Sequence, residues 1–303
     1  MSIVVVGSVA FDTIETPFGS AERAIGGSAT YFSIAASYFS HVRLVAVVGE
    51  DFSDEYRAAF LSKGIDLEGL EVVAGGKTFY WHGRYGKDPN ERESLATELN
   101  VFEAFRPILP ASYRDSEYLF LGNIDPDIQI EVLNQMEDAP FVGCDTMNFW
   151  IEGKTESLRR LLGRVDILFI NDEEARMLSG ERNLVKAAGA VLGMGPSAVV
   201  VKKGEHGAFL FTREFTFFAP AYPLAEVTDP TGAGDSFAGG FMGYLAGAPQ
   251  RNGRHLRRAM LCGTVTASFT CGSFSIERLK DIAEQDLDDR FRTLVDLVSL
   301  GEE

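Results

Sequence analysis

Short apolar runs that alternate with helical stretches are the feature that most constrains the fold of this chain. Runs rich in β-branched and other apolar residues occupy positions 3–6, 43–48, 118–121, 141–144, 167–170 and 198–201. Runs of this length bounded by turns are typical of buried strands. Helical patterns lie between them, for example at 28–39 and 54–63. Because strands that alternate with helices form mainly parallel sheets covered on both faces, an α/β fold is predicted.

The segment 70–105 departs from this alternation. Strand-like pieces occur at 71–73, 78–85 and 94–102, joined in part by a turn-rich link at 86–91. The pattern predicts a small antiparallel excursion from the main sheet, of the kind that can close over an active site as a lid. A plain edge extension, or a contact between the two copies of a homodimer, would give the same pattern.

Composition and charge exclude several classes of protein. With 46% hydrophobic and 24% charged residues, the chain has an ordinary globular composition, and its length suits a single domain spanning residues 1–303. The net charge of −16 disfavours nucleic acid as a partner, since such binders carry a basic face. No apolar run reaches membrane-spanning length, and the first residues lack a signal-peptide pattern. The three cysteines form no C-x-x-C pair, which fits a cytoplasmic location.

The run DPTGAGDSF at 229–237 carries the clearest chemical signal. Gly232, Ala233 and Gly234 stand directly before Asp235, which opens an apolar segment with regularly spaced glycines. A helix that starts at such a turn directs its free N–H groups at an anion. An acid beside an anion site is tolerable if it accepts the proton of an attacking hydroxyl, so the run predicts phosphoryl transfer. The alternative is an ordinary helix N-cap after a glycine-rich turn.

The full run, with Asp229 and Thr231 before the glycines and Gly239-Gly240 after them, resembles the C-terminal signature of the ribokinase-like, or PfkB, carbohydrate kinases. The resemblance implies a ribokinase-like three-layer α/β sandwich with a mainly parallel central sheet and a small antiparallel β lid. It also implies transfer of the γ-phosphoryl group of ATP to a hydroxyl of a sugar or sugar-like molecule. Asp235 is then the general base, and the backbone from Gly232 to Asp235 forms an anion hole.

Candidate residues for binding the phosphoryl acceptor lie in the first half of the chain. Asp12 follows the first apolar run, and Gly26-Gly27 precedes a helical stretch; in the resembled family these positions bind substrate hydroxyls and let the sugar approach the backbone. Taken alone, Asp12 fits a turn residue equally well. Family members often carry Asn where this chain has Tyr31, a departure that leaves nucleosides and other polyols open as acceptors. Asn123, just after a strand-like run, is a further candidate.

Asn171 and Glu174 follow the apolar run at 167–170 and share one helix face. They match the N-x-x-E motif of the family, which implies that they help to place Mg²⁺ near the phosphates, largely through water. The alternative is a helix N-terminus rich in acids.

Three residues of a predicted turn form the K-x-G-x-x-G pattern that contacts the nucleotide in the family: Lys202, Gly204 and Gly207. Lys202 could neutralise a phosphate oxygen, or it could be a solvated lysine on a β-turn. Asp145 and Trp150 follow another apolar run and receive no role.

The region around Gly272 lines the adenine site in the resembled family. In some members it also forms a site for a monovalent cation such as K⁺, together with the residues equivalent to Asp229 and Thr231. The spacing leaves open whether a cation binds here.

Two further functions remain open. A nucleoside kinase of the same fold would stack an aromatic residue such as Tyr31, Phe11 or Trp81 on the base. A ligand sensor without turnover would keep the anion cradle, although the intact Asp235 argues against it. In either kinase, a lid around Tyr80 and His82 is expected to keep water away from the phosphoryl group.

Overall fold

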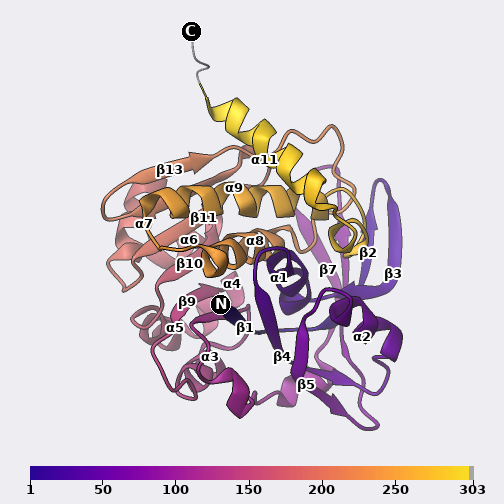
Figure 1. Ribbon diagram of the computed structural model, residues 1–303. Helices are drawn as coiled ribbons and strands as arrows, with labels where there is room; N and C mark the ends of the chain where they lie inside the picture. The colour runs from indigo at the N-terminus through magenta and orange to yellow at the C-terminus, as the bar shows by residue number, and fades with distance from the viewer. Residues whose placement is uncertain (300–303) are drawn as a thin grey trace.

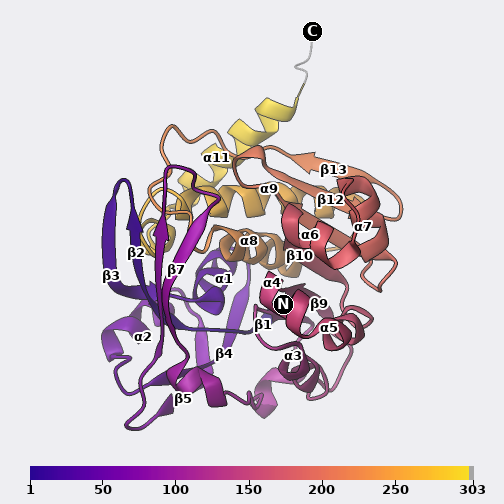
Figure 2. The ribbon, with the colours of Figure 1, turned by 180° about the vertical axis from the view of Figure 1, so that it is seen from behind.

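The structure, a computed structural model, describes residues 1–299. Its centre is a nine-stranded sheet with helices on both faces (Figures 1 and 2). In spatial order the strands are β13 (Thr216–Ala219), β12 (Ala208–Thr212), β11 (Ala198–Lys202), β10 (Ile167–Asn171), β9 (Phe141–Asp145), β8 (Tyr118–Leu121), β1 (Ser2–Val6), β4 (His41–Gly49) and β5 (Asp66–Val73). Neighbours from β5 to β11 are parallel, and β12 and β13 are antiparallel. The expected α/β fold is confirmed.

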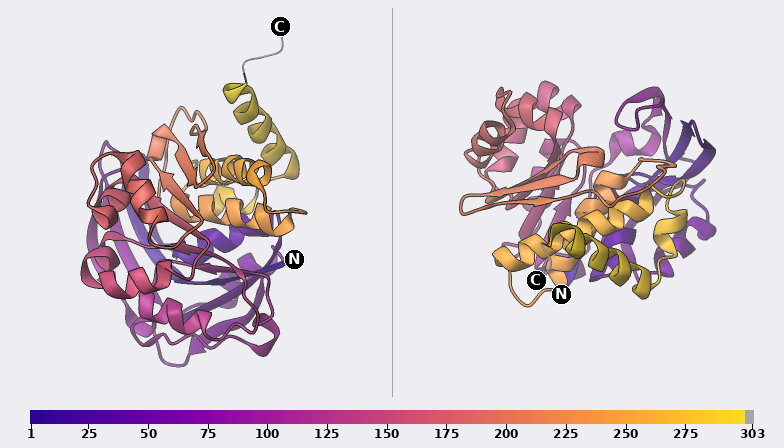
Figure 3. Two further views of the ribbon diagram at one scale, coloured as in Figure 1. Left: turned by 90° about the vertical axis from the view of Figure 1, so that its left-hand side faces the viewer. Right: turned by 90° about the horizontal axis from the view of Figure 1, so that it is seen from above.

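Helices cover both faces of the large sheet, which explains why its inner strands are apolar on both sides. One hydrophobic core lies under α1 (Ser28–Ser37), α2 (Asp54–Leu61), α8 (Ala233–Gly247), α9 (Gly253–Thr270), α10 (Glu277–Lys280) and α11 (Glu284–Val298). The second core lies under α3 (Pro126–Leu133), α4 (Asn148–Gly153), α5 (Thr155–Leu162), α6 (Asp172–Ser179) and α7 (Leu184–Leu192). Short 3₁₀ helices are η1 (Asn100–Ala104), η2 (Ala111–Tyr113) and η3 (Gly204–His206). In Figure 3, α11 runs outward from the body.

A separate four-stranded sheet stands beside the large one, at the left of Figure 2. Its order is β3 (Gly19–Gly26), β2 (Ala10–Thr16), β6 (Phe79–Tyr85) and β7 (Arg92–Glu98). Two antiparallel hairpins, β2–β3 and β6–β7, join through the parallel pair β2–β6. We call this unit the small sheet.

The small sheet draws only part of its strands from the segment expected to form it. Residues 70–105 supply β6 and β7, whereas Val73 still belongs to β5 of the large sheet. Strands β2 and β3 were not expected, because their sequences mix charged, polar and apolar residues on a sheet that is partly exposed. Asp12 therefore lies inside a strand, and the turn interpretation of this residue is wrong.

Helix α8 is held closely against its neighbours by small residues. A side chain at Gly239 would collide with the carbonyl oxygen of Phe32 in α1, and one at Gly243 would come within 2.8 Å of Ala36. The close contact of α1 with α8 fixes where the N-terminus of α8 lies relative to the large sheet. Within residues 1–299, no helix combines the length and apolarity required to cross a membrane.

Candidate active site

Polar side chains from three adjacent strands meet at the carboxyl edge of the large sheet. Strand β9 ends at Asp145, β10 at Asn171 and β11 at Lys202, and these strands are neighbours. In parallel α/β sheets this edge is where ligands bind, since strand ends and helix N-termini converge there. The N-terminus of α8 lies at the same place, because Lys202 Nζ is 2.9 Å from the position that a Cβ on Gly234 would take.

The turn before α8 depends on glycine at position 232. Gly232 has φ of 74°, in the left-handed region, and caps the helix. A side chain there would also collide with the ring of Tyr31, which packs against the turn from α1. Backbone conformation and packing therefore both exclude a larger residue.

The turn leaves two amides available for an anion. The N–H of Ala233 donates to the carbonyl of Pro230 at 3.2 Å. Across residues 1–299, the structure gives the N–H groups of Gly234 and Asp235 no backbone acceptor. Both lie in the first turn of a 15-residue helix, where the dipole favours negative charge. Of the amides in the expected anion hole, that of Ala233 is thus engaged within the turn, and the anion hole itself stays a prediction.

The carboxyl of Asp235 has the pKa of a general base that works near neutral pH. Removal from water raises the pKa of Asp235 to about 7, and the charge of Asp145 adds to this. The positive charges of Lys202 and Arg92 act in the opposite direction. A carboxyl with such a pKa accepts a proton far more readily than an ordinary aspartate does.

Lys202 supplies a positive charge beside the helix N-terminus. Its Nζ lies 3.4 Å from Oδ2 of Asp145, and both side chains are largely buried. Burial opposes the charged form, but Asp145, Glu174 and Asp235 outweigh it and raise the pKa of Lys202. The lysine therefore stays charged. The sequence analysis assigned no role to Asp145, although its position at the end of a predicted buried strand could have marked it as a site residue.

Asn171 and Glu174 form a capping box at the start of α6. Asn171 Oδ1 accepts the N–H of Glu174, and Glu174 Oε2 accepts the N–H of Asn171, each at 2.8 Å. Burial raises the pKa of Glu174 to about 7, and Asp145 contributes. The alternative given by the sequence, a helix N-terminus capped by these residues, is therefore present. Glu174 Oε1 takes no part in the capping box. Over the described part of the chain, no three acidic, His or Cys side chains are grouped around one metal position.

Asp12 brings a buried carboxyl from the small sheet to the same site. It is 4% exposed, and its carboxylate fills the space that a side chain on Gly26 would need. Burial raises the pKa of Asp12 to about 7, the charges of Asp229 and Asp235 add to it, and a bond from Gly27 and the charge of Arg92 oppose it. The influence of the Asp235 charge on Asp12 is consistent with the two sheets meeting here.

Tyr31 lies under the site and is 1% exposed. Within residues 1–299 its hydroxyl has no hydrogen-bond partner. Burial, followed by the charges of Asp12 and Asp229, raises its pKa well above the ordinary value of 10.0, so the hydroxyl keeps its proton. Phe11 is equally buried and packs on Phe52. The expectation that the ring of Tyr31 or Phe11 stacks on a base is therefore wrong, because neither ring is accessible.

Asp229 joins the loop before α8 to the segment that follows α9. Its Oδ1 accepts the N–H of Thr231 at 2.8 Å, and its Oδ2 accepts the N–H of Ser275 at 3.4 Å. Beside it, the hydroxyl of Thr228 donates to the carbonyl of Gly272 at 3.5 Å. These contacts bring the residues expected at the nucleotide and cation sites together, and the cation itself stays a prediction.

The tip of the small sheet touches both flanks of the site. The hydroxyl of Thr231 donates to Tyr85 Oη at 3.1 Å, and Asn90 packs where a side chain on Gly204 would begin. Gly204 and Gly207 shape the turn after β11, with φ of 53° and 85°. The sequence predicted instead that the lid covers the site around Tyr80 and His82.

Those two residues face away from these contacts. His82 Nε2 instead bonds Oε1 of Glu15 within the small sheet, at 3.0 Å. Tyr85 is the last residue of β6, and Asn90 lies in the turn that follows it. Apart from the strand-like and turn-like patterns of this segment, the sequence carried no signal for these two residues.

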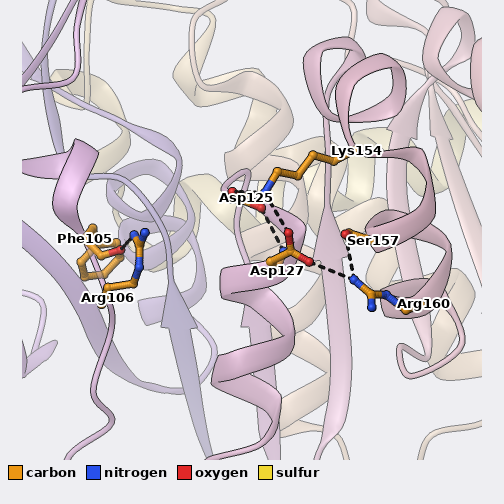
Figure 4. Close-up of polar contacts among 7 residues, drawn as sticks. All are labelled: Phe105, Arg106, Asp125, Asp127, Lys154, Ser157 and Arg160. Atoms are coloured by element: carbon orange, nitrogen blue, oxygen red, sulfur yellow. Dashed lines mark hydrogen bonds and ion pairs between the residues drawn. The ribbon is translucent and has the colours of Figure 1, made fainter.

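Asn123 lies beside α4 and a charged network. Its Oδ1 accepts the indole N–H of Trp150 at 3.0 Å, so a substrate-binding role for it remains a prediction. Figure 4 shows the network: the ammonium of Lys154 contacts Asp125 at 2.7 Å and Asp127 at 2.8 Å, and Arg160 contacts Asp127 from the other side. The network ties α3 to the α4–α5 region, which holds Trp150 near the strand ends.

Comparison with known proteins agrees with this geometry. A family model described as pfkB family carbohydrate kinase matches residues 1–279. A cytidine kinase from Thermococcus kodakarensis is 33% identical over 257 residues, which are 82% of this chain and 90% of that relative. A nucleoside kinase from Methanothermobacter thermautotrophicus is 28% identical over 81% of this chain and 83% of its own length. The solved structure of a Methanocaldococcus jannaschii nucleoside kinase of the ribokinase family superposes with a TM-score of 0.78, at 19% identity, over 96% of this chain and 98% of its own.

Proposed function

Because the chain belongs to the pfkB family of carbohydrate kinases, we propose that it transfers the γ-phosphoryl group of ATP to a hydroxyl of a sugar or sugar-like molecule. The observation that carries the proposal is the pairing at the start of α8. A carboxyl whose pKa is raised to about 7 stands beside N–H groups with no backbone acceptor among residues 1–299. That pairing suits deprotonation of an alcohol next to a migrating anion.

Each of these residues has a separate role in the proposed reaction. Asp235 accepts the proton of the attacking hydroxyl, whose oxygen forms a bond to the γ-phosphorus while the bond to ADP breaks. The N–H groups of Gly234 and Asp235 and the ammonium of Lys202 hold the charge on the transferred group. Asp12 accepts hydrogen bonds from hydroxyls of the acceptor and sets its orientation. The small sheet acts as the lid that excludes water.

Magnesium fits this site as a companion of the nucleotide. Mg²⁺ keeps several waters and prefers phosphate and carboxylate oxygens, and Glu174 Oε1 is the oxygen that the capping box leaves over. When bound, the ion would screen the triphosphate charge. Asn171 fixes the carboxylate of Glu174 through its N–H, so its contribution is to orient that group. A monovalent cation at Asp229 and Thr231 is proposed on the family resemblance alone.

A ribonucleoside is the acceptor that one observation favours. Trp81 lies directly opposite Asp12 in the parallel β2–β6 pair and is half-buried, in contrast to the inaccessible Tyr31 and Phe11. Aromatic rings stack well on nucleobases. A base on Trp81 would place the ribose near Asp12. The relatives named above include a cytidine kinase and a nucleoside kinase.

The test is consumption of ATP with a panel of ribonucleosides, free pentoses and hexoses, and sugar acids. We expect turnover by the wild type and at least one acceptor in the ribonucleoside group. Asp235→Ala should bind nucleotide without turnover. Wild type that binds ATP and ribonucleosides but never turns over would support the sensor alternative, and equal activity in both proteins would exclude Asp235 as the base.

The ribonucleoside assignment has its own variant. Trp81→Ala should raise the KM for ribonucleosides much more than the KM for free sugars. Equal changes in KM for the ribonucleosides and for the free sugars would favour a simple sugar as the acceptor. Light scattering of the full chain tests the predicted homodimer through the small sheet, for which a monomer is the contrary result.

A further inference from the structure

Gln129 is a buried polar residue that takes no part in the reaction described above. It lies about one turn into α3 and is 0% exposed. Its side-chain amide contacts the ends of two strands of the large sheet. A polar side chain is buried at a cost in stability unless it is hydrogen-bonded, so the partners of this amide indicate what it does.

The amide joins β8 and β9 just beyond the place where their pairing ends. Leu121 and Cys144 are the last residues that pair across these two strands. The Nε2 of Gln129 donates to the carbonyl of Gly122 at 2.8 Å. The carbonyl oxygens of Leu121 and Asp145 each lie 3.3 Å from the same nitrogen. One amide nitrogen, with two hydrogens, thus links both strand ends where the backbone ladder no longer does.

The carbonyls around the amide also fix its orientation, because a carbonyl oxygen can accept only from Nε2. The other end of the amide, Oε1, is buried and has no donor among residues 1–299. The link between the strand ends therefore comes with one unsatisfied buried oxygen, which lowers stability. Stability alone does not account for glutamine at this position.

Helix α3 can serve as an anchor because its first turn is itself held in place. Asp125 caps the helix by accepting the N–H of Asp127 at 3.0 Å, and the ammonium of Lys154 contacts both carboxylates (Figure 4). The N–H of Gln129 donates to the carbonyl of Asp125 at 3.0 Å, directly after this turn. The helix thus presents the amide of Gln129 to the sheet from a fixed position.

Asp145 connects this link to the candidate active site. While its carbonyl is bonded by Gln129, its Oδ1 accepts the N–H of Thr146 at 2.7 Å. Its Oδ2 lies 3.4 Å from Lys202 Nζ, at the N-terminus of α8. The place of the ammonium therefore depends on where the end of β9 is held.

We propose that Gln129 is a positioning residue, which holds the end of β9 so that Asp145 keeps the ammonium of Lys202 beside the transferring phosphoryl group. This proposal rests on the proposed function. Gln129 is fully buried and acts only through Asp145.

Gln129→Met tests the proposal in the full chain, with Gln135→Met as a matched control. Methionine has the length of glutamine but donates no hydrogen bond. Gln135 follows the opposite end of α3, where its amide bonds the backbone of Pro107 and Leu109. With ATP and the best acceptor of the panel, we expect kcat to fall about tenfold in Gln129→Met, the factor that corresponds to one hydrogen bond. Gln135→Met should keep kcat, and both KM values should change little in either variant.

A double-mutant cycle separates positioning from a merely structural role. Asp145→Asn should itself lower kcat, since it removes the ion pair with Lys202. Gln129→Met should then lower kcat much less in the Asp145→Asn background than in wild type. Equal losses in both backgrounds, or equal losses in Gln129→Met and Gln135→Met, would overturn the proposal. Unchanged kcat in Asp145→Asn would also overturn it, even if Gln129→Met does not fold.

A binding measurement distinguishes failure of this proposal from failure of the proposed function. Calorimetry compares ADP–Mg²⁺ alone with ADP–Mg²⁺ plus aluminium fluoride, a mimic of the transferring phosphoryl group. We expect fluoride to tighten binding less in Gln129→Met than in wild type or Gln135→Met. That result in a protein that phosphorylates no member of the panel would keep the role of Gln129 and reject the acceptor. An equal fluoride effect in Gln129→Met and wild type would reject the role of Gln129, and no ADP binding would reject both.

Discussion

The charged groups at the carboxyl edge of the large sheet are largely buried, whereas most of those on the small sheet are exposed. At the edge, Asp145 and Lys202 form a largely buried pair whose members sit at strand ends. On the small sheet, Arg84 and Glu15 form an exposed pair, and Arg92 is exposed without an ion pair among residues 1–299. Buried charges are fixed and strongly coupled, whereas exposed ones are screened and adaptable. We therefore propose that the edge carries out the chemistry and that the small sheet selects and covers the acceptor.

Asp12 is the exception that joins the two regions. It is a small-sheet residue, yet it is as buried as the groups at the edge, and its pKa is raised to about 7, as is that of Asp235. If the two regions have separate roles, replacing Asp12 and replacing Asp235 should change different kinetic parameters.

The largest effect is expected for Asp235→Asn. Loss of the base should lower kcat by about 10²–10⁴-fold, the range typical of general acid–base catalysis. Nucleotide affinity should stay or rise, since a negative charge beside the phosphates is removed. Steady-state kinetics and calorimetry measure the two effects, with Asp172→Asn on the neighbouring α6 as the control. A drop in ATP affinity with unchanged kcat would contradict the role.

Asp12→Asn should give the second-largest effect, on a different parameter. Loss of a charged acceptor of hydrogen bonds costs about 1.5–3 kcal/mol, so the KM for the acceptor should rise roughly 10–100-fold. The effect on kcat should be smaller than in Asp235→Asn. Steady-state kinetics in which the acceptor concentration is varied at saturating ATP measure both the KM for the acceptor and kcat. Equal losses of kcat in the two variants would remove the distinction between the regions.

The pH dependence of activity and of stability should run in opposite directions. Asp235 must be deprotonated to act, so kcat/KM, which reports the free enzyme, should rise as pH increases through about 7. Its pKa in the folded protein lies above the ordinary 3.8, so folding favours the protonated form. That contribution is fully present below about pH 4 and is lost as pH rises through about 7.

Urea unfolding of the unliganded protein between about pH 5 and about pH 8 measures this loss. Asp235→Asn should lose less stability over that interval than wild type. Equal slopes in the two proteins would mean that the carboxyl is not perturbed.

The smallest effect is expected for Tyr31→Phe, which removes the hydroxyl but keeps the ring against Gly232. A buried hydroxyl without a partner costs about 1–3 kcal/mol, so the variant should be as stable as wild type or up to about 1 kcal/mol more stable. Urea unfolding tests this, with Tyr113→Phe for comparison, because the buried hydroxyl of Tyr113 also has no hydrogen-bond partner among residues 1–299. Marked destabilisation would show that an ordered water completes the hydroxyl's hydrogen bonds.

The sequence revealed the inner strands of the large sheet, but it missed β12 and β13 at one edge of that sheet and half of the small sheet. Inner strands such as β8 and β10 are covered on both faces, so each is a continuous apolar run that is visible without any structure. Strands β2 and β3 have exposed positions and carry charged residues, and their sequences resemble loops.

The candidate site shows the same limit. The Asn171–Glu174 spacing and the Gly232–Asp235 turn are local patterns, and both appear in the structure as helix starts. The contact of Asn90 with Gly204 joins segments far apart in the chain, and no local pattern encodes it.

The ring of Tyr31 under Gly232 links the beginning of the polypeptide to its last quarter. A side chain at position 232 would collide with this ring, so the turn and the ring fit together only while that residue is glycine. An N-terminal fragment, or a chain still being made, therefore lacks the phosphate nest until α1 and α8 have docked. The proposed ATP site is therefore complete only once both helices are in place.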